Sequence, residues 1–172
     1  MARRRNRKPT APIHLSAGPL PDRLMADFAG CRLLFTDASR LRHGGLSVVL
    51  YADTASEPAV FTRSVALDGS NQLEMQAAVF GLEQASRLYP GQAIALFSDN
   101  RDALAWLAAI QSSPASGPGE FGAAAGLPDT DLHALLAHAT LHWIKGHGRC
   151  RGNALADRHA RLAAGGEDCA SR

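Results

Sequence analysis

The sequence predicts a mixed α/β domain in which helices flank a five-stranded sheet. Two observations favour this fold class. Three strand-like segments follow one another early in the chain with only short turns between them, and helix-like and strand-like segments alternate after them. Such an order is typical of a sheet that carries helices on its faces. The chain has 172 residues, of which 46% are hydrophobic, so it is long enough for one ordinary domain with a substantial core.

The first part of the sheet is predicted to be an antiparallel meander. Residues 32–37 form a near-continuous apolar run that ends in an aspartate, which indicates a buried central strand. A Gly-Gly turn leads to a second strand over residues 46–52, and a Glu-Pro turn leads to a third over residues 60–67. Strands that are so close in sequence pair through short turns.

Helices and strands alternate in the rest of the chain. A helix begins after the polar stretch 68–71, places apolar residues at helical spacing and ends at Tyr89, before Pro90 and Gly91. The later elements are a strand over 93–97, a helix over 101–111, a short helix over 131–138, a strand over 140–145 and a helix over 153–164. Residues 112–128 consist mainly of Gly, Pro, Ala and Ser and are predicted to be a loop.

Positive charge is concentrated at the N-terminus. Residues 1–8 carry five arginine and lysine side chains and no acid, so the net charge of +2 divides into +5 there and −3 elsewhere. Such an arm can pair with phosphates, and the alternative is a solvated tail. Residues 9–29 contain four prolines and little periodicity. We therefore expect a basic arm and linker over 1–29, a folded domain over 30–165 and a C-terminal tail over 166–172.

Composition also indicates the environment. The three cysteines form no closely spaced pair, which favours a reducing compartment. No apolar run approaches the ~20 residues that a membrane span needs. The N-terminal charges are not followed by the apolar stretch of a secretory signal. We expect a monomeric, cytoplasmic protein with no membrane partner.

Four carboxylates are candidate ligands for divalent cations. Asp37 and Asp99 each end a predicted strand, and parallel neighbouring strands would bring both to the same end of the sheet. Glu74 lies near the start of one helix and Asp157 near the start of the last. At a separation of ~4 Å and an effective dielectric constant near 20, each carboxylate pair repels by about 4 kcal/mol. Mg²⁺ or Mn²⁺ would remove this cost, and two such ions ~4 Å apart support phosphodiester hydrolysis.

Each acid also has a purely structural interpretation, and for Asp37 it is a cap of the turn that follows its strand. Asn71 and Glu74 have the spacing of a capping box, and Asp99 could cap the helix that follows it. Asp157 could pair with Arg161 one turn later.

Other side chains allow further interpretations. A zinc site is an alternative use of four residues, but their spacing is irregular and they belong to different predicted elements: His138, His142, His147 and Cys150. Trp106 and Trp143 lie in apolar periodic segments and are predicted to be core residues, and the alternative is a tryptophan at the rim of the site that stacks on a base.

Four strings of the sequence resemble the motifs of type I ribonuclease H in their order and spacing. The strings are FTDAS, SNQLEMQAAVFGLEQA, FSDN and WIKGHGRCRGNALAD, and together they cover about residues 32–164. The resemblance implies a ribonuclease H fold and a two-Mg²⁺ site. It also implies an enzyme that cuts the RNA strand of RNA/DNA hybrids and leaves 3′-OH and 5′-phosphate ends.

The resemblance also implies roles for individual residues. His147 would assist proton transfer or product release, and Asn71 and Asn153 would contact the hybrid. The implied metal ligands are Asp37, Glu74, Asp99 and Asp157.

The sequence departs from the family pattern around the site. Arg40, Arg42 and His43 occupy a shortened loop, Arg101 follows the third motif, and the usual basic handle is replaced by the neutral loop 112–128. Arg40, Arg42 and Arg101 are therefore candidate phosphate contacts. The alternatives are a non-catalytic module that binds hybrids, or another nuclease of the same superfamily, although such nucleases lack the KGH-type motif.

Overall fold

A computed structural model describes residues 14–113 and 131–167. The basic arm over residues 1–8, most of the predicted loop 112–128 and residues 168–172 lie outside the described residues. The strands are β1 (Arg32–Arg40), β2 (Gly44–Tyr51), β3 (Ala59–Val65), β4 (Ile94–Ser98) and β5 (Ala139–Trp143). The α-helices are α1 (Asp22–Met25), α2 (Ser70–Leu88), α3 (Arg101–Ser112), α5 (Leu132–Leu136) and α6 (Arg151–Ala163), and the 3-10 helix η1 covers Ala26–Phe28.

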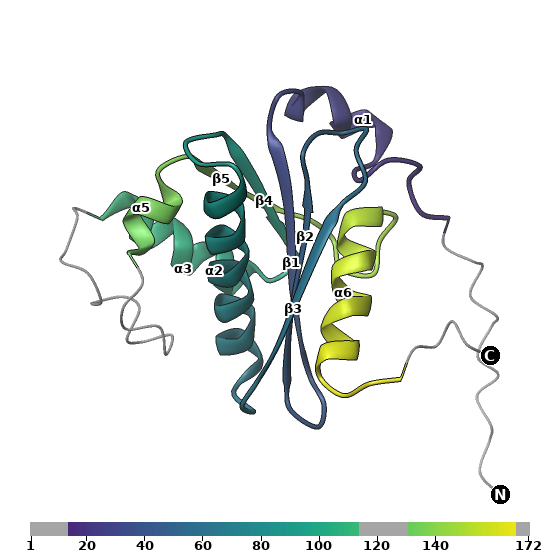
Figure 1. The fold of residues 1–172 in the computed structure, drawn as a ribbon, viewed down its shortest axis with the longest axis vertical. Helices are drawn as coiled ribbons and strands as arrows, with labels where there is room; N and C mark the ends of the chain where they lie inside the picture. The colour runs from purple at the N-terminus through teal and green to yellow at the C-terminus, as the bar shows by residue number, and fades with distance from the viewer. Residues whose placement is uncertain (1–13, 114–130, 168–172) are drawn as a thin grey trace, which may run out of the picture.

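Within the described residues, five strands form one mixed sheet in the order β3-β2-β1-β4-β5 (Figure 1). The pairs β1–β2 and β2–β3 are antiparallel, whereas β1–β4 and β4–β5 are parallel. The predicted fold class and the predicted antiparallel meander are confirmed. Because β1 and β4 run in the same direction, their C-terminal ends lie at the same edge of the sheet.

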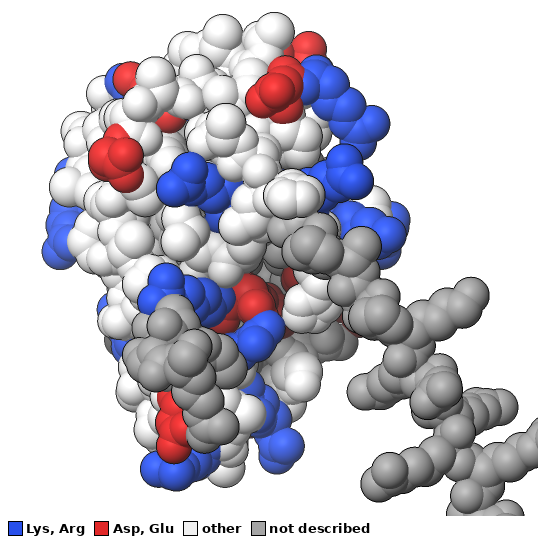
Figure 2. Space-filling model, turned by 90° about the vertical axis from the view of Figure 1, so that its right-hand side faces the viewer, with Lys and Arg blue, Asp and Glu red and all other residues white. Residues whose placement is uncertain are grey.

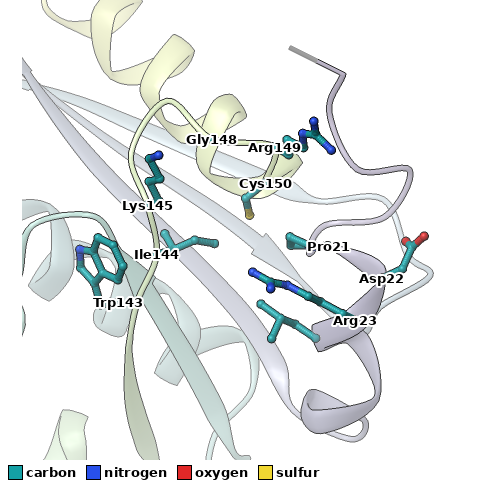
Figure 3. Close-up of a pocket in the computed structure, with 10 residues that line it drawn as sticks. Pro21, Asp22, Arg23, Trp143, Ile144, Lys145, Gly148, Arg149 and Cys150 are labelled. Carbon is teal, nitrogen blue, oxygen red and sulfur yellow. The ribbon is translucent and has the colours of Figure 1, made fainter.

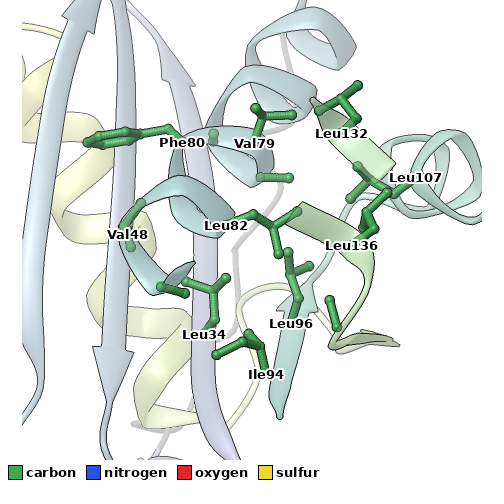
Figure 4. Close-up of a cluster of buried hydrophobic side chains, with 14 of the residues drawn as sticks. Leu34, Val48, Val79, Phe80, Leu82, Ile94, Leu96, Leu107, Leu132 and Leu136 are labelled. Carbon is green, nitrogen blue, oxygen red and sulfur yellow. The ribbon is translucent and has the colours of Figure 1, made fainter. Parts of the chain in front are cut away.

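Helices cover both faces of the sheet (Figure 1). On one face, α2, α3 and α5 pack on a cluster that includes Leu34 and Leu96, and Figure 4 shows Val79 and Leu82 of α2 in this cluster. On the other face, α6 packs on a cluster that includes Phe35. Successive side chains of a strand point to opposite faces, so a strand covered on both sides needs a continuous apolar run. This explains the apolar sequence of β1.

Two glycines allow α6 to lie very close to the sheet. A Cβ atom at Gly45 would overlap the backbone of Ala160 and Ala164, and a Cβ atom at Gly152 would overlap the ring of Phe35. The backbone of α6 therefore lies directly on β2, and its first turn on β1. This packing places Asp157 near the end of β1.

The segment before β1 is part of the folded body over its described residues, which differs from the linker expected over 9–29. Leu20 is fully buried and belongs to the same cluster as Phe35. The Pro19 carbonyl accepts a hydrogen bond of 2.9 Å from the Gly152 amide, and the Ser16 amide donates one of 2.7 Å to the Arg149 carbonyl. The prolines of this segment do not prevent packing. Leu20, which lies between Pro19 and Pro21, fills a space beside β1 and α6.

The two tryptophans differ in their burial. Trp106 packs partly buried against the cluster of α2 and α3, whereas Trp143 is 46% exposed. The prediction that Trp143 is a core residue was therefore wrong, because it is the last residue of β5, which lies at an edge of the sheet. Among the described residues, no helix combines the length and the apolar character that crossing a bilayer requires.

Candidate active site

Three carboxylates from separate elements converge at the C-terminal ends of β1 and β4. Asp37 lies in β1, Asp99 directly follows β4, and Glu74 lies in α2. One carboxylate oxygen of each can be chosen so that all three lie within 4.8 Å of one another. The register explains the first two, because Phe35 pairs with Phe97 and the two acids follow two residues later.

Glu74 reaches the cluster from α2, which packs on the face of the sheet opposite to α6. Strand β4 ends at Ser98, so beyond it the edge of β1 at Asp37 has no neighbouring strand on that side. Helix α2 lies so close to β1 that a Cβ atom at Gly81 would overlap Thr36. A long side chain from the beginning of α2 can therefore meet Asp37 beyond the end of β4.

The cluster raises the pKa values of two of its members. Burial, followed by the charges of Asp99 and Asp157, raises the pKa of Asp37 to about 7, although the Ala38 amide donates a hydrogen bond of 2.9 Å to its Oδ1. Burial, followed by the charges of Asp37 and Asp99, raises the pKa of Glu74 to about 9. In both cases negative charge is crowded away from water, which disfavours the ionised form of the carboxyl.

The cluster has the properties of a site for hard divalent cations. Its donors are all carboxylate oxygens, the ligand type that Mg²⁺ and Mn²⁺ prefer. Glu74 Oε2 is buried and has no hydrogen-bond partner among the described residues. In the same part of the chain, none of the three acids forms an ion pair. The residues therefore fit a divalent cation, which would neutralise the cluster and use the unpartnered oxygen.

Two of the structural interpretations of these acids are wrong. Helix α2 follows Gly69 as its N-cap and begins at Ser70, so Glu74 lies beyond the first turn and does not form a capping box with Asn71. Asn100, not Asp99, is the N-cap of α3, and its Oδ1 accepts a hydrogen bond of 2.8 Å from the Ala103 amide. Glu74 and Asp99 therefore have no capping role.

Asp157 stands beside the cluster and is paired differently. Both of its carboxylate oxygens accept hydrogen bonds from Arg161, with Nε at 3.1 Å from Oδ1, so the predicted i,i+4 pair is confirmed. Asp157 nevertheless lines a pocket of about 210 Å³ together with Asp99, His147 and Asn153. Its charge also raises the pKa of Asp37. The structure thus brings three of the four predicted ligands together and places the fourth at the rim.

The loop between β5 and α6 carries His147 to the same pocket. His147 is exposed and has a φ angle of 51°, in the left-handed region that histidine adopts more often than most residues. Gly146 lies against Asp99, and a Cβ atom there would overlap Oδ2 of that carboxylate. From the sequence, the glycines beside His147 suggest loop motion. The structure adds that Gly146 permits the loop backbone to lie close to the Asp99 carboxylate.

The two predicted asparagines have different surroundings. Asn153 is 3% exposed, its Nδ2 lies 3.5 Å from Asp99 Oδ2, and its Oδ1 has no partner among the described residues. Asn71 is exposed, donates a hydrogen bond of 2.8 Å from Nδ2 to Asp102, and accepts one of 3.1 Å at Oδ1 from Asn100. Sequence reasoning missed Asp102. Its position in the first turn of α3 was the available signal.

The three predicted arginines are dispersed. The Arg101 guanidinium lies 3.9 Å from the centre of the Trp143 ring, and Trp143 donates a hydrogen bond of 3.1 Å to the Asp99 carbonyl. Arg40 donates to the Asp68 carbonyl at 2.9 Å, and the Arg42 amide donates to the Ala164 carbonyl at the far end of α6. Only Arg101 therefore lies beside Asp99. Figure 2 shows basic side chains around a recessed acidic patch on the α6 side.

The described residues offer no zinc cluster of histidine and cysteine. His142 packs against the rings of Phe28 and Phe97, and Cys150 donates its thiol to the Pro19 carbonyl. Both side chains are used in packing, and burial lowers the pKa of His142 and raises that of Cys150.

Comparisons with known proteins identify the fold. No protein-family model matches the sequence, and a search of curated proteins finds no match. An N-terminal ribonuclease H domain from Mycobacterium tuberculosis, solved as a fusion with maltose binding protein, is 17% identical with a TM-score of 0.60, and the match covers 80% of this chain and 95% of that one. A ribonuclease H1 from Halobacterium salinarum is 18% identical with a TM-score of 0.57, covering 78% and 97%.

A third solved structure, LC11-RNase H1 in complex with an RNA/DNA hybrid, is 14% identical with a TM-score of 0.56, and the match covers 78% of this chain and 96% of that one. At such identities the likeness shows the fold alone. The chain has the ribonuclease H fold.

Proposed function

We propose that the chain is a metal-dependent endoribonuclease that hydrolyses the RNA strand of RNA/DNA hybrids and leaves 3′-OH and 5′-phosphate ends. The observation that carries this proposal is the convergence of Asp37, Glu74 and Asp99, with no ion pair among the described residues to neutralise them. The fold adds support, because one protein that shares it was solved in complex with an RNA/DNA hybrid.

The cluster would hold two divalent cations, Mg²⁺ or Mn²⁺. Asp37, Glu74 and Asp99 would be the central ligands, and Asp157 would join them from the rim after exchanging its contact with Arg161. Bound there, a pair of such ions supplies Lewis acidity and charge neutralisation for an in-line phosphodiester displacement.

The chain's own side chains would divide the remaining tasks. His147 is exposed beside the cluster, so its imidazole can accept or donate a proton at the attacking water or at the leaving 3′ oxygen. Asn153 would hold the Asp99 carboxylate in position through its Nδ2. Arg101 would contact a backbone phosphate, and Asn71, oriented by Asp102, would contact the hybrid from the N-terminus of α2.

One cleavage experiment tests the proposal. Labelled RNA/DNA hybrid, duplex RNA and duplex DNA are each incubated with Mg²⁺, Mn²⁺ or EDTA and separated on a gel. We expect cleavage of the RNA strand of the hybrid with either metal and none in EDTA. Asp37→Asn should abolish cleavage because a neutral amide cannot replace an anionic ligand, whereas Asp27→Asn, an exposed aspartate of η1, should not.

The other outcomes identify the alternatives. Binding of hybrid without cleavage in either metal would indicate a non-catalytic hybrid-binding module. Equal cleavage of duplex DNA would indicate a different nuclease with the same fold. Normal turnover by folded Asp37→Asn would contradict the metal site itself.

A further inference from the structure

A second pocket, of about 640 Å³, lies between the N-terminal segment and the loop that carries His147 (Figure 3). Its volume lies in the range of small-molecule sites, which is roughly 300–1,000 Å³. Its walls come from the segment before β1, which includes Arg23, from the last residue of β5 and the two residues after it (Trp143, Ile144 and Lys145), and from the loop before α6, which includes Gly148 and Arg149.

Three cations border this pocket and are not neutralised. Arg23, Lys145 and Arg149 are exposed, and none of their side chains forms an ion pair or a side-chain hydrogen bond within the residues that the structure describes. In Figure 3 the Arg23 side chain reaches across the pocket toward Ile144, whereas the carboxylate of Asp22 points away. The pocket therefore attracts an anion.

The pocket also presents an apolar and aromatic surface. Ile144 and Cys150 contribute side chains to its wall, and Trp143 is 46% exposed at its edge. A ligand that carries both negative charge and a flat apolar ring matches this combination of side chains. A nucleotide has both parts, because bases stack on aromatic side chains while their phosphates pair with lysine and arginine.

The pocket adjoins the candidate active site. Gly148 lines both the pocket of Asp99, His147 and Asp157 and the basic pocket. The Ser16–Arg149 and Gly152–Pro19 hydrogen bonds hold the two walls of the basic pocket together. A nucleic-acid strand with one phosphate at the three acids would pass over Gly148 and then enter the basic pocket.

We propose that this pocket binds an unpaired nucleotide of the RNA strand, at the point where that strand leaves the hybrid as a single strand. The proposal rests on the proposed function, because it takes the strand at the acids to be RNA. A base inside a duplex has both faces stacked and cannot enter a concave site, whereas an unpaired base can. Hybrids with a single-stranded RNA extension are then the preferred substrate class.

Binding in EDTA separates this pocket from catalysis. The full-length chain is titrated, by fluorescence anisotropy, into a blunt RNA/DNA hybrid, the same hybrid with a 5′ or a 3′ RNA extension, and single-stranded RNA alone. We expect one of the two extensions to tighten binding about tenfold, through one stacked base and its phosphates. Arg23→Ala and, separately, Lys145→Gln should remove most of this gain and change the affinity for blunt hybrid less than about twofold.

Arg87→Ala is the matched control. Arg87 is an exposed helix arginine at the opposite end of α2 from Glu74, and its loss changes the net charge as much as Arg23→Ala does. The variant should keep the full gain. Equal binding of blunt and extended hybrids, or an equal loss in Arg87→Ala, would overturn the proposal. Polyglutamate is tested as a competitor against bound single-stranded RNA. If it displaces that RNA as effectively as unlabelled RNA does, the proposal is overturned in favour of an acidic protein partner.

The two proposals fail separately. Without cleavage in Mg²⁺, a preference for extended RNA that depends on Arg23 would still support the pocket while refuting the enzyme. Cleavage of hybrid without any preference for an extension would support the enzyme and overturn the pocket.

Discussion

Gly146 lies so close to Asp99 that a Cβ atom at residue 146 would overlap the Oδ2 atom of the carboxylate. The backbone of the loop after β5 thus forms one wall around a predicted metal ligand. Because Asp99 follows β4 and Gly146 follows β5, this contact depends on the parallel pairing of the two strands. The position of His147 is therefore coupled to the position of Asp99.

Gly146→Ala should lower turnover while the protein stays folded. The added methyl must displace either the loop or the Asp99 side chain, and a shift of about 1 Å at a catalytic group can cost on the order of a hundredfold in rate. Hybrid cleavage and thermal melting would be measured together. Gly69→Ala is the control, because a Cβ atom there meets nothing within 4 Å. Wild-type turnover in Gly146→Ala would show that the contact has no role in positioning Asp99.

The raised pKa values predict how pH changes stability without metal. The pKa of Asp37 rises from 3.8 to about 7 and that of Glu74 from 4.5 to about 9, so at intermediate pH the folded protein holds protons that the unfolded chain releases. The free energy of unfolding in EDTA should therefore fall as pH rises from about 5 to 9, by up to about 1.4 kcal/mol per pH unit for each group. Mg²⁺ should raise the melting temperature more at pH 9 than at pH 5.

Asp37→Asn isolates this contribution from other titrating groups. In EDTA the variant should be more stable than wild type at pH 8 and about equally stable at pH 5, because the amide carries no charge to be desolvated. Thermal melts of both proteins across this pH range provide the measurement. If wild type were the more stable of the two at pH 8 in EDTA, the crowding of negative charge at the cluster would be refuted.

The sequence predicted the fold well because its signals are local and mutually consistent. The apolar run before Asp37 marks the central strand, and the order of elements led to the correct mixed sheet. The same residues did not reveal that Leu20 is buried, because a single leucine among prolines carries no periodicity. The sequence left the exposure of Trp143 only as an alternative to a core position, since the choice depends on β5 lying at the edge of the sheet.

The candidate site was predictable in part. The motifs identified the acids, and the register explains why Asp37 and Asp99 meet. The pairing of Asp157 with Arg161 could be foreseen from helical spacing, but whether it excludes Asp157 from the cluster depends on how α6 is packed. The basic pocket was not foreseen, because Arg23 and Lys145 are far apart in sequence and come to line one pocket only in the folded chain.

His147→Ala should lower turnover by about ten- to a thousandfold, within or below the usual range for a general acid–base group. Mg²⁺ affinity should hardly change, because the imidazole lies outside the cluster of three acids. Single-turnover cleavage and calorimetric titration of Mg²⁺ would test both statements. His138→Ala, an exposed histidine before β5, is the control. Loss of Mg²⁺ binding in His147→Ala would instead make His147 a ligand.

Asp157→Asn should retain more activity than Asp37→Asn. The Asp157 side chain is 28% exposed, so water can replace part of its contribution, whereas Asp37 is only 7% exposed. Cleavage of hybrid by the two variants would be compared over a range of Mg²⁺ concentrations, and excess Mg²⁺ should partly rescue only Asp157→Asn. Equal and complete loss in both variants would show that Asp157 is as essential as the central ligands.

The basic arm is predicted to supply much of the electrostatic attraction for substrate. Residues 1–8 carry +5, and without them the chain has a net charge of −3. Each cation that engages a phosphate contributes roughly 0.9 to the slope of the log binding constant against the log salt concentration on a B-form duplex, and a hybrid should behave similarly. If three or four of the five cations engage phosphates, deletion of the arm should flatten this slope by about three. Turnover at saturating substrate should stay near wild type while KM rises, because contacts to phosphates away from the reacting atoms bind the ground state and the transition state alike. An arm of the same length with its five cations replaced by glutamine is the matched control and should behave like the deletion. An unchanged KM and an unchanged salt slope would mean that the arm is only a solvated extension, and Arg101, which lies beside Asp99, would then remain the candidate for phosphate contact.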